Sequence, residues 1–162
     1  MRVTGASLDD LESVYRQGYC GFLRVASAVT GEEARGADAV QDAFARAIEQ
    51  RTGFRGDGPL EAWVWRIVVN AARAARPRHQ ETDVTAVPAS GAADDDPDPY
   101  GVDTWLTALP ERERLAVFLR YFADLDYRSI ATALDVEVGT ISATLHAAHE
   151  ALRRSLEEAQ QT

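Results

Sequence analysis

Three polar residues in the segment LEAWVWRIVVNAARAAR, residues 60–76, could bind phosphates together. Arg66, Asn70 and Arg73 stand at i, i+4 and i+7, and a helix places residues with this spacing on one face. We expect Trp65 to lie beside them, partly exposed. A surface for single-stranded nucleic acid needs cations for the phosphates and rings on which bases stack. By spacing alone, the more common alternative is that both tryptophans are core residues and the arginines are only solvated.

A second candidate surface lies near the C-terminus, where GTISATLHAAHEAL, residues 139–152, follows YRSIATALDVEV. Together they have the pattern of a helix-turn-helix, whose second helix enters the major groove of DNA. Its expected packing stripe is Val138, Ile141, Leu145, Ala148 and Leu152. The outward positions hold no Lys or Arg, the residues that release counterions from phosphate. They are Thr140, Ser142, Ala143, Thr144, His146, Ala147, His149 and Glu150.

No arrangement typical of an enzyme occurs in the sequence. The glycine cluster at 53–58 lacks the Lys and Ser/Thr of a phosphate-binding loop, and nucleophile-elbow, HExxH and CxxC motifs are missing. His146 and His149 stand at i and i+3, but no carboxylate or Cys is placed to complete a metal site with them. Cys20 is the only cysteine, which excludes an internal disulfide. We therefore expect no catalytic residue, no metal and no cofactor.

Charge is distributed unevenly along the 162 residues, whose net charge is −9. Residues 1–80 hold 11 Arg against 10 acidic residues, and residues 81–99 hold six acidic residues and no basic one. Residues 100–162 hold six Arg against 10 acidic residues. The acidity therefore belongs to the middle and the C-terminal part, and a local basic face can form in the first segment.

Three helical patterns precede residue 80. The first spans 8–29, with Ser7 as its N-cap and Gly31 after it. The second spans 33–50, and its apolar side consists of Ala37, Val40, Phe44, Ala47 and Ile48. The third spans 60–76, between Pro59 and Pro77. Its expected apolar stripe is Leu60, Trp63, Val64, Ile67, Val68 and Ala71.

The stretch ETDVTAVPASGAADDDPDP, residues 81–99, has no hydrophobic period and is typical of a flexible, self-repelling linker. Further helical patterns follow it, in DTWLTAL, in ERERLAVFLRYFA after Pro110, and in the helix-turn-helix. Since no β pattern of useful length occurs, we predict an all-α protein with two small helical domains, 1–80 and 100–162. No signal peptide or membrane-spanning run is found, which predicts a cytoplasmic protein without membrane insertion.

In order and spacing, these segments resemble the small extracytoplasmic-function (ECF) sigma factors of bacterial RNA polymerase. VYRQGYCGFLRVASAVTG, with the sequence from ADAVQDAF to NAARAAR, is similar to region 2. ALPERERLAVFLRYFADLDYRSIATALDVEVGTISATLHAAHEALRR is similar to region 4. The resemblance covers nearly the whole chain. It implies a factor for promoter-specific transcription initiation that binds core RNA polymerase and promoter DNA, with an anti-sigma factor as a candidate further partner.

The resemblance also implies roles for particular residues. The segment that matches the polymerase-docking region holds Asp38, Gln41, Asp42 and Phe44. The loop that captures an unpaired base of the −10 element corresponds to Phe54, Arg55, Gly56 and Asp57. The helix that grips the melted strand corresponds to Trp65, Arg66, Asn70, Arg73 and Arg76. In region 4, the candidate −35 contacts are Arg128, Thr140, Ser142, Thr144 and His146.

Region 4 departs from the family pattern on its DNA-facing side. The family's recognition helix commonly reads like GTVKSRLHRARKAL, and its cations are replaced here by Ser142, Thr144, Ala147, His149 and Glu150. Asp135 occupies a turn position where Gly is usual, and Glu137 replaces the usual Ser cap. These changes predict a helix-turn-helix with weak affinity for the −35 element. The alternative function is a sigma-like adaptor whose region 4 binds a protein, such as an anti-sigma factor or an activator.

Overall fold

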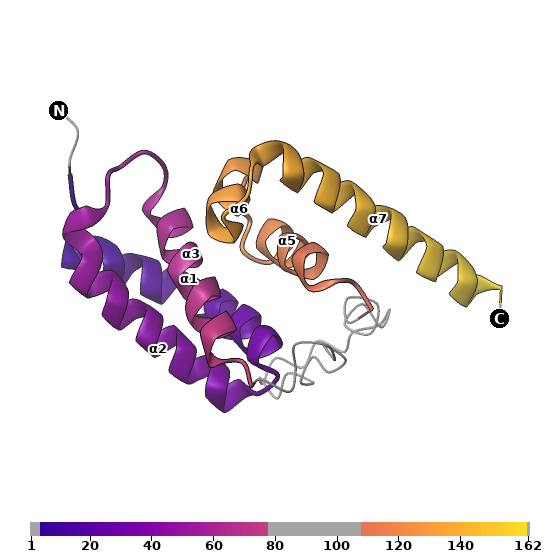
Figure 1. Cartoon of the computed structure of the whole chain (residues 1–162). Helices are drawn as coiled ribbons and strands as arrows, with labels where there is room; N and C mark the ends of the chain where they lie inside the picture. Colours follow the sequence, from indigo (N-terminus) through magenta and orange to yellow (C-terminus); the bar gives the residue numbers. More distant parts are fainter. Residues whose placement is uncertain (1–3, 78–107, 162) are drawn as a thin grey trace.

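The computed structural model describes residues 4–77 and 108–161, which form six α-helices and one 3₁₀ turn and contain no strand (Figure 1). The expectation of an all-α protein is therefore confirmed for these ranges. The predicted linker at 81–99 lies outside them, as does most of the helical pattern in DTWLTAL. None of the helices within the described ranges is both long enough and apolar enough to cross a bilayer.

Helix α1 (Leu8–Thr30) begins and ends as its sequence predicts. The backbone N–H of Asp10 donates to Ser7 Oγ (3.0 Å), and the N–H of Ser7 donates to Asp10 Oδ2 (3.3 Å). This reciprocal pair is a capping box, which satisfies two amides at the start of the helix. Gly31 ends the helix with φ of 80°, in the left-handed region that favours glycine.

Helix α2 (Glu33–Gln50) packs closely against α1. The close approach depends on Gly36, because a Cβ at this position would lie 2.6 Å from the backbone nitrogen of Ser27. The aromatic core begins beyond this crossing. Phe22 contacts Phe44 with ring centroids 5.4 Å apart, and it contacts Trp65 at 4.4 Å.

Helix α3 (Leu60–Ala75) follows a 3₁₀ turn (Arg51–Gly53) and packs against both α1 and α2. Its buried side includes Trp65, which is 1% exposed, so the expectation that this ring is partly exposed is wrong. Trp63 and Ile67, which were expected in the packing stripe, are only partly buried. Helix α3 contacts helices on more than one side, which explains why Trp65 is buried although it lies off the expected stripe.

The C-terminal helices are α5 (Glu111–Tyr121), α6 (Tyr127–Leu134) and α7 (Val138–Gln160). The carboxylate of Asp126 caps α6 by accepting the Ser129 N–H at 2.7 Å, and this hydrogen bond lowers the pKa of Asp126. Asp135 turns the chain between α6 and α7 with φ of 56°. Glu137 is the N-cap of α7 and makes no side-chain cap. Helices α6 and α7 therefore form the predicted helix-turn-helix.

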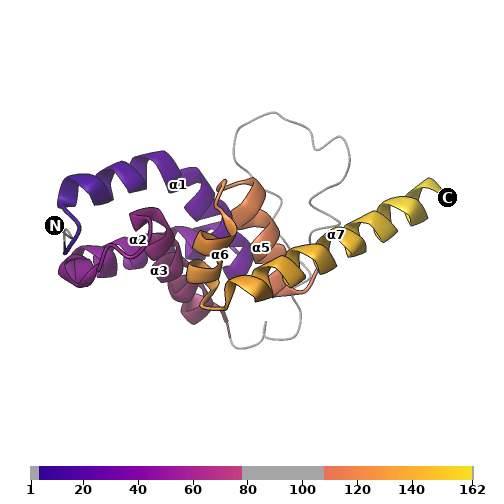
Figure 2. The same ribbon diagram turned by 90° about the horizontal axis from the view of Figure 1, so that it is seen from above.

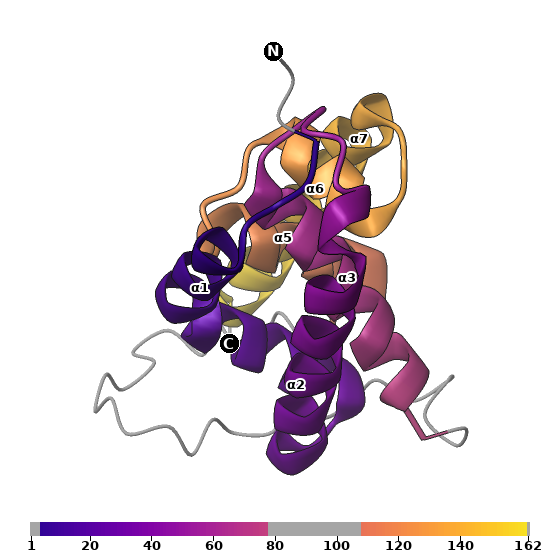
Figure 3. The ribbon, with the colours of Figure 1, turned by 90° about the vertical axis from the view of Figure 1, so that its left-hand side faces the viewer.

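The two groups of helices meet where α3 packs against α6, with a smaller contact between α1 and α5 (Figures 1 and 2). Helix α7 begins beside α6 and then extends away from the other helices toward the C-terminus (Figure 2). Helix α2 lies on the side of the molecule away from α7 (Figures 1 and 3). The C-terminal helices thus cover part of the side of α3 that does not pack against α1 and α2.

Candidate nucleic-acid interface

The three polar residues of α3 do share one face. Arg66 and Asn70 are exposed, and Arg73 is half-buried beside them. Trp65 points to the opposite side, into the core, so it cannot stack on a base in this structure. Its indole N–H has no hydrogen-bond partner in the described part of the chain. The cationic part of the predicted surface is therefore present, and the stacking part has to come from elsewhere.

An aromatic ring stands in the adjacent loop. Phe54 is partly buried, and its ring lies 5.6 Å from that of Trp63 at the start of α3. The backbone carbonyl of Phe54 accepts the N–H of Gly5 at 2.8 Å, which ties the loop to the segment before α1. Gly56 has φ of 72°, a conformation that favours glycine and turns the loop outward.

This loop and the start of α1 line an open cavity of about 540 Å³. Phe54, Arg55 and Gly56 line one side of it. Asp10 and Ser13 line the other side, and the sequence analysis did not assign them to a site. They stand more than 40 positions before the loop, and Asp10 has a sufficient local explanation as part of the capping box. Asp57 is exposed but does not line the cavity.

The arginines of α3 pair with acidic residues of the C-terminal helices. Arg66 Nη2 lies 3.3 Å from Asp135 Oδ1, and Arg73 Nε lies 3.9 Å from Glu111 Oε1. Arg76 also forms an ion pair with Glu111. Close by, Arg114 is almost fully buried, and its pKa is lowered by burial, an effect that Glu111 opposes. Glu111 thus stands among several guanidinium groups, and the sequence analysis did not single it out.

The predicted polymerase-docking residues divide into two groups. Asp38, Gln41 and Asp42 are exposed along α2, as expected. Phe44 is 7% exposed and packs edge-on against Tyr15 with ring centroids 4.9 Å apart. Phe44 is therefore not available for direct contact in this structure, and its role is to hold α2 in place.

The helix-turn-helix presents few groups for DNA. Ser142 and His146 are exposed on α7, Thr140 is partly exposed, and Arg128 is exposed on α6. Thr144 was expected to point outward but is buried, and its hydroxyl donates to the Thr140 carbonyl at 2.7 Å. Thr144 points inward because it stands three positions after Ile141 and four before Ala148, on the same packing stripe. The hydrogen bond satisfies its buried hydroxyl and leaves no free donor on it.

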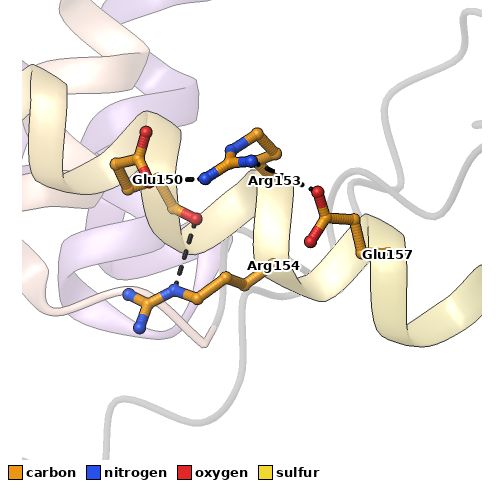
Figure 4. A network of polar contacts seen from close by, with 4 residues as sticks. All are labelled: Glu150, Arg153, Arg154 and Glu157. Carbon is orange, nitrogen blue, oxygen red and sulfur yellow. Dashed lines mark hydrogen bonds and ion pairs between the residues drawn. The ribbon is translucent and has the colours of Figure 1, made fainter.

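The arginines near the end of α7 are engaged within their own helix (Figure 4). Arg153 forms ion pairs with Glu150 at 2.9 Å and with Glu157 at 3.3 Å. Arg154 Nε donates to the backbone carbonyl of Glu150 at 3.4 Å. The hydrogen bond and charge of Arg153 lower the pKa of Glu150, which keeps this carboxylate ionised. Among the described residues, no group of three or more His, Cys, Asp or Glu is placed to hold a metal ion.

Comparisons with known proteins match both halves of the chain. The family model described as Sigma-70 region 2 matches residues 15–82, and the model described as Sigma-70, region 4 matches residues 102–152. The ECF RNA polymerase sigma-E factor of Escherichia coli strain K12 is 33% identical over an alignment of 134 residues, and the match covers 71% of this chain and 70% of that protein. The RNA polymerase sigma-H factor of Pseudomonas aeruginosa is 32% identical over an alignment of 139 residues, and the match covers 74% of this chain and 72% of that protein.

Two solved structures share the fold. The sigma factor RpoE in complex with the anti-sigma factor NepR, from Bartonella quintana, has a TM-score of 0.68 and 21% identity, covering 93% of this chain and 98% of that one. CnrH in complex with the cytosolic domain of CnrY has a TM-score of 0.67 and 19% identity, covering 91% and 88%. At these identities the likeness establishes a common fold.

Proposed function

The chain belongs to the extracytoplasmic-function group of RNA polymerase sigma factors, and on that premise we propose that the exposed face of α3 and the adjacent loop bind the −10 region of its promoters. Sigma factors are regulatory proteins, and this one directs promoter-specific initiation of transcription by core RNA polymerase. The proposal assigns the melted strand to Arg66, Asn70, Arg73 and Arg76. We assign one unpaired base to the loop of Phe54, Arg55, Gly56 and Asp57 and to the cavity that the first three of these residues line.

The observation that carries the proposal is the juxtaposition of these two features. The cavity of about 540 Å³ opens at the N-terminal end of α3, and the arginines follow along the exposed side of the same helix. An open cavity of this kind beside an aromatic ring can accept a base that has left the duplex. Arg66 and Arg73, two helical turns apart with Asn70 between them, can then neutralise the phosphates that follow. Phe54 takes the stacking role that the buried Trp65 cannot perform.

The test removes the two cations together. We expect Arg66→Ala with Arg73→Ala to lower open-complex formation by roughly tenfold and to reduce its salt dependence, because two phosphate contacts are lost. Core polymerase and the purified chain would transcribe genomic DNA of the source bacterium, and sequencing of transcript 5′ ends would locate promoters. Permanganate reactivity would then measure melting at those promoters.

Arg16→Ala with Arg35→Ala is the matched control, since both side chains are exposed and pair only within their own segments, with Glu12 and Glu32. This control removes the same charge from the same group of helices. Melting that is unchanged in the α3 variant, or equally reduced in the control, would contradict the assignment of the α3 face.

We also propose that the exposed side of α2, at Asp38, Gln41 and Asp42, docks on core polymerase.

We propose further that residues 1–80 and 100–162 act as two domains joined by 81–99, and that the chain has no catalytic activity of its own. Since its binding partners are promoter DNA and core polymerase, we infer that it acts in the cytoplasm. An anti-sigma factor remains part of the proposal as a partner of unspecified identity.

One observation favours a second function for the C-terminal helices. Ser142, Ala147 and His149 are exposed where the family's recognition helix carries cations, so α7 offers DNA little countercharge. An adaptor function, in which region 4 binds a protein instead of the −35 element, fits this surface. Transcription that depends on α3 but is indifferent to the −35 sequence would support it.

A further inference from the structure

The cavity beside Phe54 has two walls that come from distant parts of the chain. The loop after the 3₁₀ turn forms one wall, and the start of α1 with the segment before it forms the other. The backbone N–H of Gly5 donates to the Phe54 carbonyl at 2.8 Å. The N–H of Ala6 donates to the Arg51 carbonyl at 2.9 Å. The N-terminal wall is therefore anchored directly to the loop that holds the aromatic ring.

Among the described residues that line this cavity, Asp10 alone carries a carboxylate. A carboxylate is unexpected on a surface for nucleic acid, because it repels phosphate and accepts hydrogen bonds without donating any. The same property makes it selective toward a base, since only an N–H group on the edge of the base can pair with it. The position of Asp10 thus favours contact with a base over contact with the DNA backbone.

The capping box of α1 uses only one oxygen of this carboxylate. Asp10 Oδ2 accepts the Ser7 hydroxyl at 2.7 Å and the Ser7 N–H at 3.3 Å. These two hydrogen bonds occupy both lone pairs of Oδ2. Within the described part of the chain, no group donates a hydrogen bond to Oδ1. The helix cap therefore holds the carboxylate in place and leaves one oxygen free for a ligand.

One free acceptor distinguishes between the four bases. Cytosine and adenine present an exocyclic amino group, which can donate to it, beside a ring nitrogen that accepts. Thymine and guanine present a carbonyl oxygen at the same place, which a carboxylate repels. Guanine could instead donate its N1–H and its amino group together, but this pairing requires both carboxylate oxygens. Ser13 and Arg55 line the same cavity, and both carry donors for the ring nitrogen of cytosine or adenine.

We propose that Asp10 makes the base-binding cavity select cytosine or adenine over thymine and guanine. Its free oxygen accepts a hydrogen bond from the exocyclic amino group, and Ser13 and Arg55 supply donors for the adjacent ring nitrogen. This inference rests on the proposed function, because it takes the cavity to be the site of the unpaired base. It adds the chemical class of that base and assigns the choice to a residue of α1, more than 40 positions before the loop.

The experiment compares the four bases at each position of the −10 region in turn. Core polymerase with the full chain would be titrated onto fluorescein-labelled templates of a mapped promoter whose −10 region is held open by mismatches. An open template removes differences in duplex stability between the bases. At one position, we expect cytosine or adenine to give about tenfold tighter binding than thymine or guanine.

Asp10→Asn keeps the shape of the side chain and reverses its chemistry. The amide oxygen can take the place of Oδ2 in the capping box, which leaves the NH₂ group for the ligand. Because an NH₂ group donates to a carbonyl oxygen and not to an amino group, we expect the preference to shift to thymine or guanine. Asp10→Glu retains a carboxylate at a capping-box position where Glu is common, and it should retain the preference of the parent.

The matched control is Asp9→Asn. Asp9 is also an exposed acidic residue in the first turn of α1, but it does not line the cavity. The control removes the same charge from the same end of the same helix. It should leave the base preference unchanged.

A further measurement needs no variant of the protein, so it holds even if Asp10→Asn fails to fold. Replacing the preferred cytosine by 2-pyrimidinone, or the preferred adenine by purine, removes only the amino group and should weaken binding about tenfold. The role of Asp10 is overturned if this replacement has no effect, if the parent shows no preference for amino-bearing bases, or if Asp10→Asn keeps that preference. A shift of equal size in Asp9→Asn would overturn it as well.

Phe54→Leu separates this inference from the proposed function. Leucine keeps an apolar contact with Trp63 but has no ring, so it should weaken binding to the open template whichever base is present. Weaker binding by Phe54→Leu together with an unchanged base preference in Asp10→Asn would overturn the role of Asp10 alone. Unchanged binding by Phe54→Leu would contradict the proposed function of the loop itself.

Discussion

Gly36 determines how closely α1 and α2 can approach. A Cβ at this position would lie 2.5 Å from Ser27 Oγ and 2.6 Å from the Ser27 backbone nitrogen. The side chain could rotate away, but the backbone atom can move only if the helices separate. We therefore expect Gly36→Ala to lower the free energy of unfolding by about 1–3 kcal/mol, measured by urea denaturation followed by circular dichroism.

Gly139→Ala is the control for this substitution, because nothing lies within 4 Å of the Cβ that it adds in the first turn of α7. It should be neutral or stabilising by up to about 1 kcal/mol, since Ala restricts the unfolded chain. If the two variants lost stability equally, the close approach at Gly36 would not be the cause.

Residues whose role is local were predictable from sequence. Ser7 and Gly31 act through neighbours within four positions, and both cap α1 as expected. Trp65 and Thr144 were predicted wrongly. Trp65 is buried because α3 packs against helices on more than one side, which its own spacing does not show. Thr144 stands three positions after Ile141 and four before Ala148, so its spacing places it on their packing stripe although its side chain is polar.

In helix α7, the residues that pack against the other helices are distinct from those that would contact DNA. Ile141, Leu145 and Ala148 are buried as predicted and hold α7 against α5 and α6, whereas Val138 is 43% exposed. The fold of the helix-turn-helix thus depends on residues other than those that would meet DNA. Helix bounds were likewise predicted within one residue for α1, α2 and α3, because caps and prolines mark them.

Restoring cations to α7 should restore an affinity for duplex DNA. We expect the parent chain to bind a 20-base-pair duplex of mixed sequence weakly, and Ser142→Lys with Ala147→Arg to bind it more tightly with a steeper salt dependence. Each new phosphate contact adds about 0.9 to the slope of log affinity against log salt. Fluorescence anisotropy at two salt concentrations measures both quantities.

The control places the same charges at the far end of the helix, as Ala159→Arg with Gln160→Lys, where both residues are exposed. These cations lie beyond the part of the helix that enters a groove. Tight, salt-sensitive binding by the parent chain would show that Thr140, Ser142 and His146 suffice without cations, and the adaptor function would lose its support.

At the scale of the whole molecule, the contact between the two groups of helices was not predictable from sequence. Arg76 and Glu111 are 35 positions apart, and no periodic pattern links them. The sequence showed only that arginine is concentrated before residue 80 and acid after it. Which arginine pairs with which carboxylate depends on the packing of α3 against α6. The sequence alone therefore did not predict that the C-terminal helices contact the DNA-binding face.

The arrangement also separates the two proposed binding surfaces. The C-terminal helices cover part of the α3 face, whereas α2 lies on the side away from α7, with Asp38, Gln41 and Asp42 exposed (Figures 1 and 3). Core polymerase can therefore reach α2 while the C-terminal helices pack against α3. Docking through α2 would then precede the DNA contacts of the α3 face.

This order predicts that polymerase binding and DNA binding respond to different substitutions. Asp42→Arg should weaken binding to core polymerase by roughly tenfold, because reversing a charge at the edge of an interface slows association. It should leave the affinity of the free chain for a fluorescein-labelled single-stranded 12-mer of thymidylate unchanged, since Asp42 is exposed on α2 and is not one of the residues assigned to DNA. Glu33→Arg, exposed on the opposite side of α2, is the control and should affect neither measurement. If Asp42→Arg bound core polymerase as the parent does, the docking surface would have to lie elsewhere, and the separation of the polymerase-binding surface from the DNA-binding surface would lose its basis.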